Sequence, residues 1–172
     1  MDLYEAIKNR RSVRSYTSDE ISEEVLNRVM DATRSAPSGG NRQPWTFILV
    51  KDPGVKSALV PAAGGQRFLA DAPVIVVACG VQIPISRGGY MGEYGMLVDV
   101  SIAMTHLILA AHGEGLGTCW IGDFENDEVR EVLGIPEEIQ VVALTPLGYP
   151  ESVPSSRGRK PLEEIVRIDR WG

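Results

Sequence analysis

The chain has 172 residues, 44% of them hydrophobic and 23% charged, a composition typical of a globular protein of one domain. Its net charge of −6 and its pI of about 5.0 argue against a general nucleic-acid surface, which would be strongly basic. This length leads us to expect a single domain over residues 1–172. The opening sequence, MDLYEAIKNR, lacks the apolar core of a signal peptide, so we expect a cytoplasmic protein.

Two capped helices are predicted near the start of the chain. Asp2 is placed to cap the first, which carries Ala6 and Ile7 on one face. Ser22 begins the second, and the two glutamates that follow it suit the positive end of the helix dipole. Pro37 ends this second helix because proline removes a backbone donor.

A loop and two strands are predicted next. The loop is SAPSGGNRQP, which is rich in turn-forming Gly, Pro and Asn. The apolar runs at 45–50 (WTFILV) and 73–79 (PVIVVAC) contain many β-branched residues and predict strands. Short helical pieces, broken by Pro and Gly, are expected between them.

The segment at about 95–112 predicts a helix that is apolar on nearly all sides. A membrane span needs about 20 uninterrupted apolar residues, and Asp99 and His106 interrupt this stretch. We therefore expect a buried helix and no membrane partner. Its outer side is covered either by the rest of the chain or by a second subunit, and the residues leave both open.

The second half of the chain predicts two more strands and two helices. The strands are expected at 117–122 (GTCWIG) and 139–149 (IQVVALTPLGY), with a helix between them that Asn126 caps and Gly134 closes. The last segment, SSRGRKPLEEIV, is basic and then helical. This mixed order of elements favours an α+β sandwich over a doubly wound parallel sheet.

Several kinds of active site are excluded by their missing motifs. The chain has no Walker A, GxGxxG or GxSxG motif, and a spacing of six residues places His106 and His112 on different helix faces, which does not suit a metal site. No metal site is predicted. Cys79 and Cys119 lie in separate apolar runs without a CxxC motif, which favours two reduced core thiols; a disulfide between them stays open.

A dense cationic cluster stands out in this acidic chain. Arg10, Arg11 and Arg14 surround Ser12, and the segment RGR at 157–159 adds two more guanidinium groups. The planar guanidinium donates two parallel hydrogen bonds to a phosphate, so the two clusters together could form a monophosphate site. The alternative is that these arginines pair with surface carboxylates.

The loop APSGGNRQPW is the second candidate for ligand binding. Gly39 and Gly40 allow the backbone to approach a ligand closely. Ser38, Asn41 and Gln43 offer hydroxyl and amide groups suited to a polar heterocycle. An ordinary helix-to-strand loop would have the same composition.

Five stretches in order resemble the nitroreductase family of flavoproteins: IKNRRSVRSY, APSGGNRQPW, GQRFLADAPVIVVAC, GLGTCWIGDF and RGRKPLEEIV. The resemblance spans almost the whole chain. It implies an α/β/α sandwich with a mainly antiparallel central sheet. It also implies a homodimer with FMN bound at the subunit interface, in which the apolar helix at 95–112 forms the dimer core.

The resemblance implies three groups of cofactor-binding residues. The group for the phosphate and ribityl chain is Arg10, Arg11, Ser12, Arg14, Arg157 and Arg159. The group that contacts the isoalloxazine ring of the partner subunit is Pro37, Ser38, Gly39 and Asn41. The group along the ring within the same chain is Gln66, Trp120, Ile121 and Gly122. The backbone N–H of Gly122 is expected to face flavin N5, and no side chain is expected to act as a catalytic group.

The implied activity is a ping-pong transfer in which NAD(P)H reduces FMN and leaves, and a nitroaromatic, quinone or related acceptor then enters. The segment QIPISRGGYMGEYG at 82–95 is either a substrate lid or a plain surface loop. Its candidate substrate contacts are Arg87, Tyr90, Met91 and Tyr94. Two other functions stay open: a flavin store or redox sensor without turnover, and a small nucleic-acid binder, which the acidic pI opposes.

Overall fold

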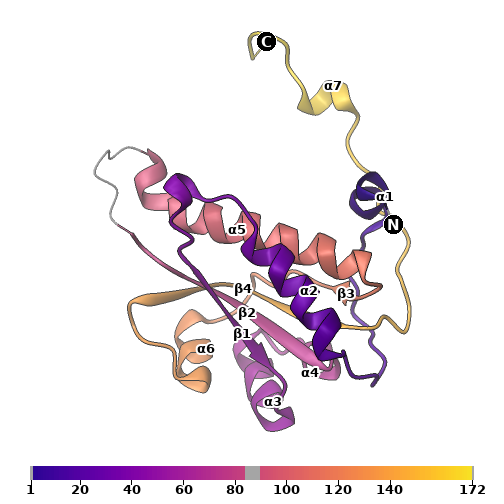
Figure 1. Cartoon of the computed structure of the whole chain (residues 1–172), viewed down its shortest axis with the longest axis vertical. Helices are drawn as coiled ribbons and strands as arrows, with labels where there is room; N and C mark the ends of the chain where they lie inside the picture. Colours follow the sequence, from indigo (N-terminus) through magenta and orange to yellow (C-terminus); the bar gives the residue numbers. More distant parts are fainter. Residues whose placement is uncertain (1, 84–89, 172) are drawn as a thin grey trace.

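The structure is a computed structural model that describes residues 2–83 and 90–171. The helices are α1 (Leu3–Asn9), α2 (Glu23–Arg34), α3 (Pro53–Ala62), α4 (Phe68–Asp71), α5 (Tyr90–Gly113), α6 (Asn126–Leu133) and α7 (Leu162–Ile165), with a 3₁₀ turn η1 at Gly39–Asn41. The strands are β1 (Trp45–Val50), β2 (Val74–Val81), β3 (Gly117–Thr118) and β4 (Ile139–Gly148). Figure 1 shows their arrangement.

The strands form a four-stranded antiparallel sheet in the order β1-β2-β4-β3. Strand β2 is internal in the sheet, and side chains from the helices pack against both of its faces. Val74 and Val76 join the core on one face, while Ile75 and Val77 join the core on the other. This period of two explains why the strand reads as a continuous apolar run. The predicted α+β fold with an antiparallel sheet is confirmed.

Helices cover the two faces of the sheet (Figure 1). On one face, α2 and α5 lie side by side and bury Val29, Met104 and Leu107 completely. On the other face, α3, α4 and α6 bury Leu59 and Leu69 completely. Each of these fully buried side chains contributes about 1.5–3 kcal/mol of transfer free energy.

Three of the predicted helix ends are confirmed. The Asp2 carboxylate accepts hydrogen bonds from the first turn of α1, and the Ser22 hydroxyl accepts one from the N–H of Val25 in α2. Gly134 follows α6 with φ of 64°, the left-handed conformation that glycine adopts at low cost.

The predicted strand at 117–122 is wrong beyond its first two residues. Strand β3 ends at Thr118 because the N–H of the next residue, Cys119, donates to the Thr145 hydroxyl instead of a backbone carbonyl. The chain returns to the sheet only at Ile121, which exchanges both backbone hydrogen bonds with Leu144.

The predicted cap of α6 is also wrong. Asn126 is the first residue of the helix rather than its cap. Its side-chain amide instead donates to the carbonyl of Val141 at 2.8 Å. The same side chain also accepts from the N–H of Val141 at 3.5 Å, so Asn126 pairs with both backbone groups of this residue of β4.

Helix α5 begins at Tyr90, so the last part of the 82–95 segment is helical rather than a loop. The helix is not buried on all sides either: Tyr94, Leu97 and Val98 are 44%, 38% and 39% exposed. By length and composition the stretch Tyr94–Gly113 could cross a membrane. Its other side forms the core with α2 and the sheet, which is the packing of a core helix.

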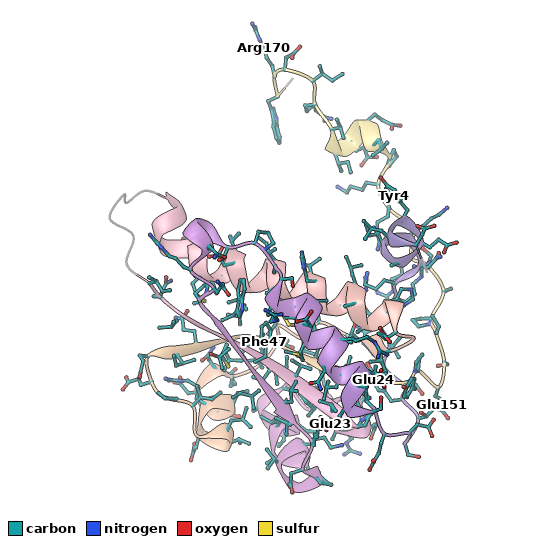
Figure 2. All side chains as sticks on the ribbon, viewed as in Figure 1. Tyr4, Glu23, Glu24, Phe47, Glu151 and Arg170 are labelled. Carbon is teal, nitrogen blue, oxygen red and sulfur yellow. The ribbon has the colours of Figure 1, made fainter. Side chains whose placement is uncertain are left out.

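The large apolar side chains that are exposed lie on four parts of the described chain. Among the described residues, they lie on α1, on the outer side of α5, at Trp120 and along 153–171. Residues 152–171 leave the body of the molecule as an extended arm beside α1, and none of their side chains is buried (Figure 1). Figure 2 shows Tyr4 and Arg170 pointing away from the body.

Candidate functional site

The two arginine clusters line one pocket of about 150 Å³. Its walls come from the segment after α1 and from the extended arm. The lining residues are Arg10, Arg11, Ser12, Arg14, Pro154, Ser155, Ser156, Arg157 and Arg159. Among the described residues, no carboxylate lines this pocket, so its guanidinium groups are concentrated there without a neutralising charge in the lining.

Backbone pairing explains how segments so distant in the sequence meet. The N–H of Val13 donates to the carbonyl of Thr118 at 2.9 Å, which fixes the first cluster beside β3. The N–H of Glu151 then donates to the carbonyl of Ser15 at 3.0 Å, and the Ser15 hydroxyl donates to the Glu151 carboxylate. The arm therefore leaves the sheet directly beside the first cluster.

The arginines of the pocket differ in what holds them. The Arg11 guanidinium folds back onto the carbonyls of Lys8 and Arg10, at 2.8 and 2.9 Å, and so caps the end of α1. The Arg14 guanidinium lies over the ring of Phe68, 5.8 Å from its centroid. Arg10 makes no side-chain hydrogen bond with any described residue and is half-buried. Among the described residues, Arg10 and the exposed Arg157 are thus the guanidinium groups of this pocket that neither a hydrogen bond nor an aromatic ring holds.

The positive charge of the pocket shifts the pKa values of two neighbouring side chains, His112 and Cys119. Burial lowers the pKa of His112, and the charges of Arg10 and Arg11 lower it further, so this imidazole is neutral at pH 7. Burial raises the pKa of the Cys119 thiol, while Arg14 and Arg10 act in the opposite direction.

A second hollow of about 250 Å³ adjoins the first and shares Arg10 and Ser12 with it. It extends to Trp120 and to one side of α5 at Ile108 and Leu109. The two hollows together form a groove with a cationic end and a more apolar end. Such a groove suits an elongated ligand with an anionic end and a flat aromatic end.

The predicted ring-contacting residues lie close together at the far end of β3. Gly122 and Asp123 are exposed in the turn after Ile121, which is itself buried against β4. The Gln66 amide reaches this turn, with its nitrogen 3.4 Å from the carbonyl of Asp123. The backbone N–H of Gly122 makes no hydrogen bond within the described parts of the chain.

The loop with Gly39 and Gly40, at residues 38–43, lies away from the arginine pocket in the fold. The N–H of Gly39 donates to the Asp99 carboxylate, which holds the turn η1 against the first half of α5. Ile108, which lines the groove, lies about 13 Å farther along α5 at ~1.5 Å per residue. One copy of the chain therefore does not bring Pro37, Ser38 and their neighbours to the arginine pocket.

The predicted substrate contacts are only partly described. Arg87 lies outside the described residues, as do the side chains of Tyr90 and Met91. Tyr94 lies on the outer side of α5, where it lines a shallow groove with Leu97 and Val98.

Two features of the site were missed in the sequence. Ser155 and Ser156 line the arginine pocket, and their position directly before Arg157 was the available signal. Asp99 was noted only as an interruption of the apolar helix, and its contact with Gly39 is visible only in the fold.

Comparisons with known proteins agree with this geometry. The nitroreductase family model matches residues 7–66 and 55–149. An NADH dehydrogenase of Thermus thermophilus is 32% identical, covering 96% of this chain and 95% of that protein. An FMN reductase [NAD(P)H] of Bacillus subtilis is 29% identical, covering 95% and 72%.

The solved structure of B. megaterium NfrA2 superimposes on all of this chain and on 76% of its own, with a TM-score of 0.92 at 27% identity. The order of the motifs, the antiparallel sheet between two helical layers and the family match all agree. The chain belongs to the nitroreductase family.

Proposed function

We propose that this protein is an FMN-dependent oxidoreductase that uses NAD(P)H to reduce nitroaromatics, quinones or related small acceptors. The observation that carries the proposal is the convergence of Arg10 and Ser12 with Arg157 and Arg159 on one pocket without a carboxylate. Relatives named NADH dehydrogenase and FMN reductase [NAD(P)H] support the cofactor and the electron donor.

The residues present fit FMN. Guanidinium and hydroxyl donors suit its phosphate, which takes paired hydrogen bonds from arginine. The adjoining hollow, with Thr118, Trp120 and Ile108, suits the rest of an elongated ligand. We assign the phosphate and ribityl chain to Arg10, Arg11, Ser12, Arg14, Arg157 and Arg159, and the ring to Gln66, Trp120, Ile121 and Gly122.

When bound, FMN supplies the two-electron chemistry that links the donor to the acceptor. The chain's own residues bind, orient and polarise it. The arginines hold the phosphate end, and the uncommitted N–H of Gly122 offers a hydrogen bond at the ring. No side chain is assigned as an acid, base or nucleophile. Donor and acceptor would use the same open face in turn, which is a ping-pong order.

We further propose that the active form is a homodimer, because the site is incomplete in one chain. The 38–43 loop is held far along α5 from the arginine pocket of its own chain, so in the proposed dimer the loop of one chain reaches the site of the other. The exposed apolar face of α5 and the exposed arm supply surfaces for that contact. The small acceptor and the second chain are the partners of this cytoplasmic enzyme.

The test starts with the protein purified without added cofactor. Its visible absorption spectrum is recorded, and NADH or NADPH is then added without oxygen. A yellow protein that bleaches supports the proposal, and a colourless protein that fails to take up added FMN overturns it. Steady oxidation of NAD(P)H with a quinone supports an enzyme, whereas a stop after one equivalent indicates a flavin store.

A further inference from the structure

The 38–43 loop is held in one shape by its own residues. The Ser38 hydroxyl accepts from the N–H of Gln43 at 2.9 Å, and the Gln43 amide donates to two oxygens of Asn41, both at 3.2 Å. Asn41 and Gln43 have φ of 55° and 50°, an uncommon conformation that persists where the surroundings hold it. Arg42 lies between them with a helical backbone conformation, so the loop sets the direction in which its Cα–Cβ bond points.

The Arg42 guanidinium is exposed and, within the described residues, makes no ion pair and no hydrogen bond. By contrast, Arg28, Arg34 and Arg130 all pair with carboxylates. Asp99 lines the same pocket as Arg42, but its carboxylate is bound by a backbone N–H of the loop. Within the parts of the chain that the structure describes, the 38–43 loop thus presents a cation without a partner.

Arg42 stands at the edge of a pocket of about 120 Å³. Pro44, Ile83 and Met96 form its apolar part, and Gln82 adds an amide. This pocket is separate from the arginine pocket of the same chain, with which it shares no residue. It therefore calls for a ligand other than the phosphate of the chain's own FMN.

This step rests on the proposed function, which places the 38–43 loop of one chain over the flavin of the other. We infer that Arg42 is a specificity-determining residue that binds a phosphate group of NAD(P)H at that flavin. The reduced nicotinamide is uncharged, whereas its nucleotide carries a pyrophosphate and, in NADPH, a 2′-phosphate. The guanidinium fork of Arg42 matches either group.

The test compares the FMN-loaded wild type with Arg42→Ala. Calorimetric titration with NADP⁺ and NAD⁺ measures binding without turnover. Stopped-flow reduction by NADPH, NADH and the uncharged 1-benzyl-1,4-dihydronicotinamide measures electron transfer. Loss of a charge-assisted hydrogen bond weakens nucleotide binding by about tenfold or more, with the uncharged donor unaffected. Arg42→Lys keeps the positive charge but loses the paired N–H donors of the guanidinium. Its nucleotide affinity should therefore lie between those of the wild type and Arg42→Ala.

The matched control is Arg34→Ala, which removes an exposed arginine already paired with Asp31. If Arg42→Ala lowers the affinity for NADP⁺ and NAD⁺ equally, Arg42 binds the pyrophosphate. If it lowers the affinity for NADP⁺ alone, Arg42 binds the 2′-phosphate. Unchanged nucleotide binding, or an equal loss of rate with the uncharged donor, overturns the inference. A wild type that holds no FMN, or that none of the three donors reduces, overturns the proposed function instead.

Discussion

The backbone N–H of Gly39 donates to both carboxylate oxygens of Asp99, at 3.1 and 3.2 Å. This contact joins the turn η1 to α5 across 60 positions of sequence. Hydrogen bonds to an ionised acceptor contribute about 1.5–3 kcal/mol, and less where solvent reaches them as it does here. Asp99 is therefore the residue that positions the glycine loop.

Replacing Asp99 with Ala should release the loop. We expect amide hydrogen exchange at Gly39 to become faster by about tenfold, because its acceptor is lost. Asp99→Asn keeps one neutral acceptor oxygen and should give an intermediate rate. Exchange at Leu107, in the buried part of α5, should stay unchanged and serves as the internal control. Equal Gly39 exchange in all three proteins would contradict the positioning role.

The phosphate pocket makes a prediction about cofactor retention. Arg10→Ala and Arg159→Ala should each weaken FMN binding by about 10- to 100-fold, the worth of a charge-assisted hydrogen bond. The double variant should purify largely without FMN. Lys at either position should restore only part of the affinity because its ammonium lacks the paired donors.

Titration of FMN into the apoproteins, followed by flavin fluorescence, measures these affinities. Arg170→Ala is the control, since Arg170 lies at the end of the arm and does not line the pocket (Figure 2). A double variant with full FMN content would show that the phosphate lies elsewhere.

The outer face of α5 makes a prediction about assembly. Val98 is 39% exposed there, and Val98→Glu would place a charge in the proposed dimer contact. We expect a shift from dimer to monomer in sedimentation velocity, together with loss of FMN. Ala58→Glu adds the same charge to an exposed site on α3, in the opposite layer, and should change neither. A Val98→Glu protein that stays dimeric and yellow would exclude this face as the interface.

Alkaline pH should destabilise the fold. Burial raises the pKa of the Cys79 thiol from its ordinary value of 9.0 to about 11. Above pH 9 the unfolded chain loses this proton while the folded chain keeps it, so the free energy of unfolding falls as pH rises from 9 to 11. The slope from this group is on the order of 1 kcal/mol per pH unit.

Urea unfolding at several pH values, in the presence of a reductant, measures this slope. Cys79→Ala should be less stable at pH 7 because it leaves a small cavity, yet its stability should fall less between pH 9 and 11. The slope that remains comes from Cys119 and Tyr16, whose pKa values burial also raises. An equal slope in both proteins would show that Cys79 ionises as freely in the folded state as in the unfolded one.

The sequence by itself determined the local structure. The caps at Asp2 and Ser22, the left-handed Gly134 and the apolar run of β2 were all readable because each depends on neighbouring residues or on a period of two. The order of motifs also indicated the family, which the family match confirms.

Only the tertiary structure decided which distant groups meet. Asn126 was expected to cap its own helix, yet its side-chain amide pairs with the backbone N–H and carbonyl of Val141 in β4. The GTCWIG run was expected to be one strand, yet the Thr145 hydroxyl takes the N–H of Cys119.

The same holds for the site. Composition identified both arginine clusters, but their shared pocket depends on the pairing of Val13 with Thr118 and of Glu151 with Ser15. The glycine loop was recognised, but its tie to Asp99 and its distance from the pocket were not. Hydrogen-bond partners and charge neighbours across a fold are set by how the layers pack, and no local stretch of sequence contains that information.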